Sequence, residues 1–222
     1  QSGLLPKWTL ANAETYVMVG DPSDPIIADL YAFGGTGFDT QAALNAMIKE
    51  ATQTNNNRPG LNYLQSKGYL PEDGGYGCCN YYGSASTTLE YNTADFSIAA
   101  FAQALGDSGN YQTFVNRAQG WQNLLNTGDK YLEPRYQNGS FPSSYSPNSQ
   151  TGWVEGDGAQ YNWMVPFNLA GLFSGLGGNS SVVSRLDNFF TQLNGDLGSS
   201  YAFLGNEPTL ETPWEYDYAG TP

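Results

Sequence analysis

The chain contains no histidine, and this absence removes several kinds of chemistry. Histidine is the usual base of a catalytic triad, the commonest zinc ligand and the ordinary switch near neutral pH. Acid–base chemistry therefore falls to carboxylates, with Tyr and Lys as minor candidates. A bound metal would be a hard cation held by oxygen atoms, which favours calcium.

Positive charge is also scarce, with 8 Lys and Arg against 21 Asp and Glu and a net charge of −13. Binding to nucleic acid or to an anionic membrane surface requires Lys and Arg, so the composition argues against both. No run approaches the ~18 apolar residues of a membrane-spanning helix. Charged residues make up only 13% of the chain, which contains 16 Tyr and 5 Trp. This neutral, polar and aromatic composition suits contact with carbohydrate.

The chain has only two cysteines, and they are adjacent, at Cys78 and Cys79 in a glycine-rich segment. Two cysteines cannot form a four-thiolate zinc site. Adjacent cysteines can form a strained disulfide, which would indicate an oxidising compartment, and two free thiols are the alternative. The segments Asn138-Gly139-Ser140 and Asn179-Ser180-Ser181 match the N-glycosylation acceptor pattern. Together these features favour a secreted or extracellular protein.

Hydrophobic periodicity predicts a chain rich in amphipathic helices. In the helix predicted over 39–52, Asp39 is a suitable N-cap, and Pro166 is expected to interrupt or kink the helix over 158–175. Glu90 and Asp95 lie five residues apart, so they do not share a helix face and are interpreted as structural. The predicted helices cover 23–34, 39–52, 58–67, 86–105, 111–126, 158–175 and 180–194.

Long aromatic-rich loops are predicted over 68–85, 127–156 and 195–222, and such loops tend to carry function. Because strand alternation is lacking, the predicted fold class is mainly α. Helices that alternate with long loops indicate antiparallel pairs wound into an α/α toroid. The predicted helices are too few to close a ring, so we expect one domain over 1–222 that forms part of such a barrel.

Glu155 lies in the most informative stretch of the chain, between Trp153 and Trp163. Glycines and aromatic residues surround this carboxylate, and a helix-like segment follows it. Aromatic rings pack against the C–H face of a sugar, and amide side chains bind its hydroxyls. A carboxyl that is sheltered from water can keep its proton near neutral pH and deliver it to a leaving oxygen. Alternatively, Glu155 caps or charges the N-terminus of the next helix. Composition leaves both interpretations open.

Eight short segments stand out along the chain: Leu5-Pro6-Lys7-Trp8, Met18-Val19-Gly20-Asp21, Thr88-Leu89-Glu90-Tyr91, Glu133-Pro134-Arg135, Glu155-Gly156-Asp157-Gly158-Ala159-Gln160-Tyr161, Val165-Pro166, Gly205-Asn206-Glu207-Pro208 and Tyr218-Ala219-Gly220. With these segments in this order, the sequence resembles glycoside hydrolase family 92 from near Pro6 to its C-terminus. Members of that family are calcium-dependent exo-α-mannosidases.

The resemblance implies calcium-dependent, inverting hydrolysis of terminal α-mannosides of the mannan or N-glycan type. It implies an (α/α)₆ barrel packed against a separate N-terminal β-sandwich, with Glu155 as general acid. Inversion needs a carboxylate base on the opposite face of the sugar, roughly 6.5–9.5 Å from the acid. Asn206 and Glu207 match the family segment near the leaving-group subsite and the calcium, so Glu207 is also expected to bind calcium, the implied cofactor.

Several of these segments supply candidate sugar contacts, each with a structural alternative. Trp8 and Trp153, like Trp163, could belong to the core, and at least one of the three is expected to do so. Asp21 could instead cap the helix that starts at residue 23, and Arg135 could pair with a loop acid. The substrate-binding candidates are Trp8, Asp21, Arg135, Trp153, Gln160, Asn206 and Glu207.

The sequence also departs from the family pattern. Phe167-Asn168 stands where the family usually has His-Asp, and a tryptophan usual near Ala159 is absent. Both changes could alter linkage preference. The family's base lies in an Asp-Asp segment beyond Tyr-Ala-Gly, whereas this chain ends at Pro222. We therefore expect the chain to carry the acid without the base, and to require a C-terminal barrel segment and a β-sandwich as partners. The alternatives are a non-catalytic carbohydrate-binding or scaffold module, and another α/α-toroid glycosidase or lyase.

Overall fold

A computed structural model describes residues 3–75, 83–192 and 194–222. The chain groups into two compact units. Unit 1 comprises 1–70, 74–81 and 87–120, and unit 2 comprises 71–73, 82–86 and 121–222. The single domain expected over 1–222 stays a prediction. Cys78 and Cys79, with their predicted disulfide, lie outside the described residues.

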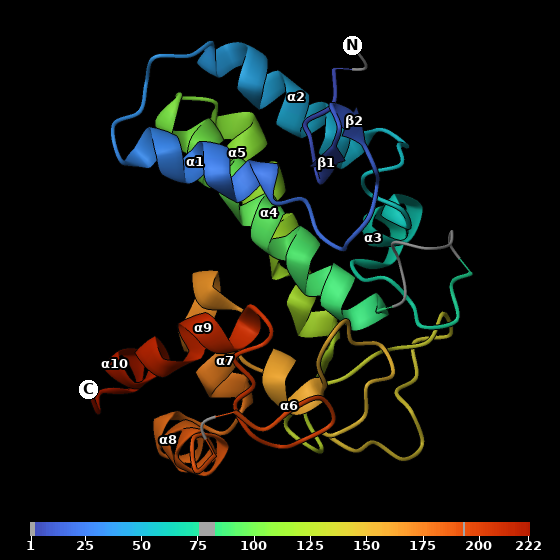
Figure 1. Cartoon of the computed structure of the whole chain (residues 1–222), viewed down its shortest axis with the longest axis vertical. Helices are drawn as coiled ribbons and strands as arrows, with labels where there is room; N and C mark the ends of the chain where they lie inside the picture. Colours follow the sequence, from blue (N-terminus) through green and yellow to red (C-terminus); the bar gives the residue numbers. More distant parts are fainter. Residues whose placement is uncertain (1–2, 76–82, 193) are drawn as a thin grey trace. The chain divides into compact units, whose positions relative to one another are not determined.

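Unit 1 begins with a short antiparallel hairpin and continues as helices (Figure 1). In the hairpin, Thr9 pairs with Glu14 and Leu10 with Ala13. The elements are β1 (Thr9–Leu10), β2 (Ala13–Glu14), α1 (Ser23–Ala32), α2 (Thr40–Thr52), α3 (Leu61–Lys67), α4 (Ser84–Ala104, whose first three residues belong to unit 2) and α5 (Ser108–Ala118).

The core of unit 1 lies where α2, α4 and α5 meet. Capping fixes where two of these helices start: the Asp39 side chain accepts a hydrogen bond from Ala42 N, and that of Asp107 from Asn110 N. The N-cap predicted at Asp39 is thereby confirmed. On α2 the buried residues recur at helical spacing, so one stripe faces the core. The buried cluster consists of Leu44, Met47, Ala51, Ile98, Ala99, Phe101, Ala102 and Phe114.

Unit 2 consists of shorter helices and one further hairpin. In Figure 1, α6 to α10 occupy the orange to red end of the chain. Residues of α10 contact α7 and α8, and residues of α9 contact α6. The elements are β3 (Leu125–Asn126), β4 (Tyr131–Leu132), α6 (Gly158–Tyr161), α7 (Leu169–Gly175), α8 (Asn179–Phe189), α9 (Pro208–Glu211) and α10 (Glu215–Ala219), with 3₁₀-helices over Gln119–Asn123 (whose first two residues belong to unit 1), Pro166–Asn168 and Thr212–Trp214.

The mainly helical fold class is confirmed, but two predicted segments differ. The helix predicted over 111–126 leaves α-geometry after Ala118, and a Cβ at Gly120 would lie only 2.5 Å from Gly68 O. The interruption expected in the helix over 158–175 is confirmed, because α6 ends at Tyr161 and a 3₁₀ turn begins at Pro166. The loop predicted over 195–222 is wrong, because it contains α9 and α10. The toroid and its incomplete ring stay predictions. No helix in the described ranges is long and apolar enough to cross a membrane.

Candidate active site

Glu155 occupies a strained turn in unit 2. Its φ angle is +53°, in the left-handed region that non-glycine residues seldom adopt. Its side chain is exposed, so the shelter from water that we expected for this carboxyl is not found in the described residues, although both neighbours in the chain are buried. A backbone held in such a conformation must be stabilised by its surroundings, and strained residues of this kind cluster at functional sites.

Hydrogen bonds hold the backbone on both sides of Glu155. Val154 N donates to Ser86 Oγ at 2.9 Å. Val154 O accepts from Tyr161 Oη at 2.7 Å and from Asn206 Nδ2 at 3.1 Å. On the other side, Gly156 is closely packed, because a Cβ there would lie 3.0 Å from Tyr161 Cε2. Segments far apart in the sequence therefore present the Glu155 carboxylate to solvent in one backbone conformation.

Asp157, and not Glu155, caps the helix that follows. Its side chain accepts hydrogen bonds from Ala159 N at 3.0 Å and Gln160 N at 3.1 Å. Gln160 Oε1 accepts in return from Asp157 N, which completes a capping box. Burial raises the pKa of Asp157 to about 6. The interpretation of Glu155 as a helix cap is therefore wrong, and the Asp-x-x-Gln spacing would have identified the true cap.

Three predicted sugar contacts support this turn. Trp153 is buried and stacks on Tyr161 with ring centroids 5.3 Å apart, so it belongs to the core. Gln160 Nε2 donates to Asp196 O at 3.1 Å, and Asn206 Nδ2 bonds to Val154 O as described. The structure thus brings Trp153, Gln160 and Asn206 together around Glu155. Their contacts with sugar stay predictions, and Tyr161 is a supporting residue that the sequence analysis missed.

Arg135 is held by its own loop. Its Nε donates to Gly139 O at 2.7 Å and its Nη1 to Asn123 O at 3.0 Å, while the guanidinium lies 4.9 Å from the centroid of the Phe141 ring. Backbone carbonyls are therefore partners of Arg135, and its pairing with a loop acid stays a prediction. A contact between Arg135 and substrate stays a prediction.

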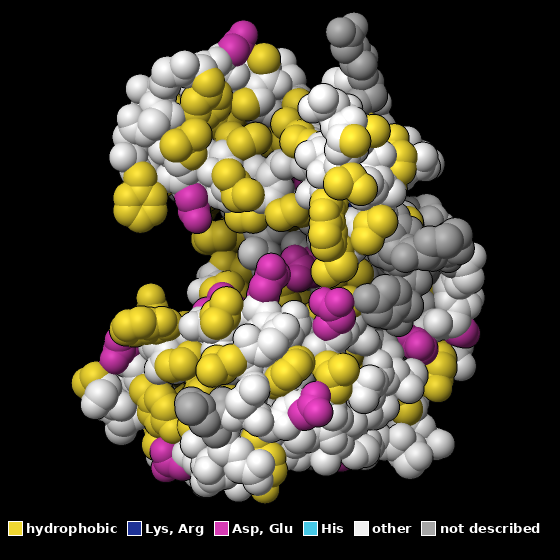
Figure 2. All heavy atoms as spheres, viewed as in Figure 1, with side chains coloured by type: hydrophobic (Ala, Val, Ile, Leu, Met, Phe, Trp, Pro, Cys, Tyr) yellow, Lys and Arg dark blue, Asp and Glu magenta, His cyan; other side chains and the backbone are white. Residues whose placement is uncertain are grey.

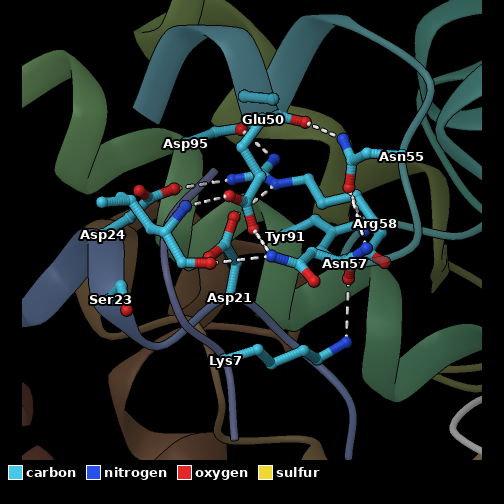
Figure 3. Close-up of polar contacts among 12 residues, drawn as sticks. Lys7, Asp21, Ser23, Asp24, Glu50, Asn55, Asn57, Arg58, Tyr91 and Asp95 are labelled. Carbon is cyan, nitrogen blue, oxygen red and sulfur yellow. Dashed lines mark hydrogen bonds and ion pairs between the residues drawn. The ribbon is translucent and has the colours of Figure 1, made fainter. Parts of the chain in front are cut away.

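Trp8 and Asp21, the two candidates in unit 1, have contrasting surroundings. The Trp8 side chain is exposed next to the β1–β2 hairpin. Asp21 is buried, and Figure 3 shows its carboxylate directed at Arg58. The cap suggested for Asp21 is wrong, because Pro22 occupies the N-cap position of α1. The role of either residue in sugar binding stays a prediction.

Arg58 bonds to three buried carboxylates at once (Figure 3). Its Nε donates to Asp21 and its Nη2 to Asp24, each at 2.8 Å. Its Nη1 donates to Asp95, also at 2.8 Å, and its guanidinium lies 5.1 Å from the centroid of the Tyr91 ring. All four charged side chains are fully buried. The structural role predicted for Asp95 is thereby confirmed.

Sequence and structure comparisons identify the family. The family model of the Glycosyl hydrolase family 92 catalytic domain matches residues 1–222. The chain belongs to glycosyl hydrolase family 92. An uncharacterised secreted glycosidase of Arthroderma benhamiae is 27% identical in an alignment 253 residues long. This alignment covers 99% of this chain and 32% of that protein.

Solved structures agree with membership of family 92. A family GH92 alpha-mannosidase from Bacteroides thetaiotaomicron is 31% identical with a TM-score of 0.87, over 99% of this chain and 28% of that one. A GH92 inverting mannosidase from the same organism is 24% identical with a TM-score of 0.84, over 97% and 31% of the two chains, which shows a shared fold alone. This family 92 chain spans less than a third of the length of either mannosidase.

Glu207, the predicted calcium ligand, is exposed at the N-cap position of α9. Its backbone N donates to Asn206 Oδ1 at 2.9 Å. Calcium takes about 6–8 oxygen ligands. Within the described ranges, no group of three or more acidic, histidine or cysteine side chains is placed to bind a metal. Glu207 therefore offers one accessible carboxylate, which does not form a site by itself.

In this family 92 chain, Glu207, Glu211 and Glu215 follow one another at four-residue spacing along α9 and α10. Glu207 is exposed, Glu211 is half-buried and Glu215 is buried. Burial, and then the charge of Glu207, raises the pKa of Glu211 to about 7. Burial, and then the charge of Glu211, raises the pKa of Glu215 to about 9. Glu215 is 3% exposed, and neither of its oxygens has a hydrogen-bond partner within the described ranges. Glu215 is therefore protonated in the folded state at neutral pH.

We expect Glu215→Gln to remove a pH-dependent loss of stability. The pKa of Glu215 in the folded state lies above its unfolded value of 4.5. The free energy of unfolding is therefore highest below pH 4.5 and declines as the pH rises toward 9, because the unfolded state loses this proton first. At pH 7 the substitution should gain up to roughly 3 kcal/mol, since each pH unit above the unfolded pKa contributes about 1.4 kcal/mol. Urea unfolding at pH 4 and pH 7 measures the difference. Asp217→Asn, which changes an exposed carboxylate of the same helix, is the control. Equal pH dependence in the Glu215→Gln and parent proteins would contradict the assignment.

Proposed function

We propose that the protein that contains this chain hydrolyses terminal α-mannosidic bonds with inversion, and that Glu155 is its general acid. The observation that carries the proposal is the held, strained turn that presents the exposed Glu155 carboxylate. Family membership over the whole chain supports a glycosidase, and the alpha-mannosidase at 31% identity supports mannose as the sugar.

In the proposed reaction, the Glu155 carboxyl donates its proton to the glycosidic oxygen as the bond between that oxygen and the anomeric carbon breaks. A carboxylate base on the opposite face takes a proton from water, and this water attacks the anomeric carbon. The base belongs, by family resemblance, to a segment beyond Tyr218-Ala219-Gly220. The sugar would be placed by the residues around the turn, with Trp153, Gln160 and Asn206 keeping Glu155 in position.

Calcium is proposed as the cofactor, with Glu207 as one ligand. When bound, it would hold sugar hydroxyls and favour distortion of the ring. The neutral polar composition, with 13% charged residues, also supports a carbohydrate partner. On the face drawn in Figure 2, acidic side chains are scattered among polar and hydrophobic ones, in agreement with the net charge of −13. We propose a secreted location, which the secreted relative supports.

The test is hydrolysis of an aryl α-mannoside by the protein as its gene encodes it. We expect turnover that a calcium chelator abolishes and added calcium restores. The first product seen by NMR should be β-mannose, because inversion changes the anomeric configuration. The matching β-mannoside is the control and should not react. Mannoside binding without turnover would instead support the carbohydrate-binding module, and activity that survives chelation would exclude calcium as the cofactor.

A further inference from the structure

Unit 2 contains a small pocket, which Glu155 does not line. Its volume is about 200 Å³, below the roughly 300–1,000 Å³ of sites for drug-sized ligands. The pocket therefore has room for one small ligand. Its lining is polar and aromatic. Asn162, the C-cap of α6, and the next residue, Trp163, line it together with Tyr131 of β4. The helix α8 contributes Ser184, Arg185 and Asn188.

Two residues that line this pocket, Asn162 and Trp163, each carry a buried hydrogen-bond donor that has no acceptor among the described residues. Asn162 is 1% exposed and Trp163 is 3% exposed. Within the described ranges, neither Asn162 Nδ2 nor Trp163 Nε1 has a hydrogen-bond partner. Asn162 Oδ1 accepts a hydrogen bond from Leu132 N at 3.1 Å. This bond fixes the orientation of the side-chain amide, so the NH₂ group is the part of Asn162 that lacks a partner among the described residues. Buried donors are nearly always paired in native proteins, so these two indicate a ligand that accepts hydrogen bonds.

Arg185 adds positive charge to the same pocket. Its Nη1 donates to Lys130 O at 2.6 Å, and its guanidinium lies 4.5 Å from the centroid of the Tyr131 ring. These contacts hold the side chain in place and leave guanidinium N–H groups for a ligand, because the group carries five. None of the described residues that line the pocket is acidic, although the whole chain has 21 acids and only 8 bases.

We propose that this pocket binds the anionic group of a small acidic saccharide, either the carboxylate of a uronic acid or a phosphate on a sugar. Indole and guanidinium N–H groups can only donate, and carboxylate and phosphate oxygens can only accept, so the two sets match. The hydroxyl and amide side chains of Ser184 and Asn188 supply contacts for sugar hydroxyls. The binding site is separate from the Glu155 turn and does not depend on the proposed hydrolysis.

The test is calorimetric titration of the protein, as its gene encodes it, with glucuronate, mannose 6-phosphate, inorganic phosphate and mannose. We expect at least one sugar acid to bind and mannose to bind at least tenfold more weakly. Glucuronate reports a carboxylate ligand, and mannose 6-phosphate reports a phosphate ligand. Inorganic phosphate should bind more weakly than the preferred sugar acid, because it lacks the hydroxyl contacts. Equal affinity for charged and neutral sugars, or no binding by either acid, would overturn the proposal.

Three variants locate the binding. Arg185→Gln should weaken it about ten- to hundredfold, since a hydrogen bond to a charged group is lost, and Arg185→Lys should weaken it less. Trp163→Phe keeps a ring but removes the N–H donor, so we expect a loss of about fivefold. Trp214→Phe, at an exposed tryptophan of unit 2 that does not line this pocket, is the control. Unchanged affinity in both Arg185→Gln and Trp163→Phe, with parent-like melting temperatures, would place any binding elsewhere and reject the site.

Discussion

Arg58→Met is expected to unfold unit 1. The substitution removes the positive charge that three fully buried aspartates share, Asp21, Asp24 and Asp95. Burial, and then the charge of Asp21, already raises the pKa of Asp24, with Arg58 opposing this shift. Loss of one partner from a buried ion pair costs about 3–5 kcal/mol, and here Asp21 and Asp24 both lose Arg58 while Asp95 keeps Arg117. Because an ordinary domain has only about 5–15 kcal/mol of stability, we expect most of unit 1 to be unfolded at 25 °C.

Urea unfolding followed by circular dichroism, together with hydrogen exchange of the α2 and α4 amides, measures this effect. Arg117→Gln is a graded control, because Arg117 bonds to Asp95 alone among the acids of this cluster and its side chain is 14% exposed. It should destabilise less than Arg58→Met. Adding Asp21→Asn and Asp24→Asn to Arg58→Met removes the two carboxylate charges that lose Arg58 and do not pair with Arg117, and should recover part of the loss. A change below 1 kcal/mol for Arg58→Met would contradict a stabilising role for the cluster.

Local sequence patterns predicted the longer helices well. The helix predicted over 39–52 is found at 40–52, and that predicted over 86–105 is found at 84–104. The first begins at the Asp39 cap, and the second has apolar residues at helical spacing before Gly106, signals that can be recognised within a few residues. The segment 208–219 was missed because its short helical turns contain Pro208 and Pro213, which read as breaks in the sequence. Proline at the first position of a helical turn is in fact favourable, since that N–H needs no partner within the helix.

The candidate site was partly predictable, because some of its residues lie close together in the sequence. Glu155, Asp157 and Gln160 lie within six residues, so their spacing alone can indicate both the carboxylate and the capping box. Contacts across long separations could not be read in this way. Asn206 lies 52 positions from Val154, whose carbonyl it binds, and Arg58 lies 37 positions from Asp21. These pairings depend on how whole helices pack, and a single sequence carries no direct record of that packing.

Glu155→Gln is expected to lower the rate on natural α-mannosides by about 10²–10⁴-fold, the usual contribution of acid–base assistance. Glutamine keeps the size and the backbone of glutamate but cannot donate the proton that the leaving oxygen requires. The loss should therefore appear mainly in kcat, with KM changed little. It should be much smaller for an aryl mannoside with a very acidic phenol, whose leaving oxygen needs little protonation.

The comparison between these two substrates separates a proton donor from a residue that only shapes the turn. If Glu155 were structural, Glu155→Gln would lower both rates by the same factor, because a displaced turn harms every substrate alike. Asp196→Asn is the matched control, since Asp196 is another exposed carboxylate of unit 2 at positive φ, 104°. Its change should leave the ratio of the two rates unaltered. A Glu155→Gln enzyme with near-parental activity on natural substrates would remove Glu155 from the acid role and leave its strained backbone without a catalytic explanation.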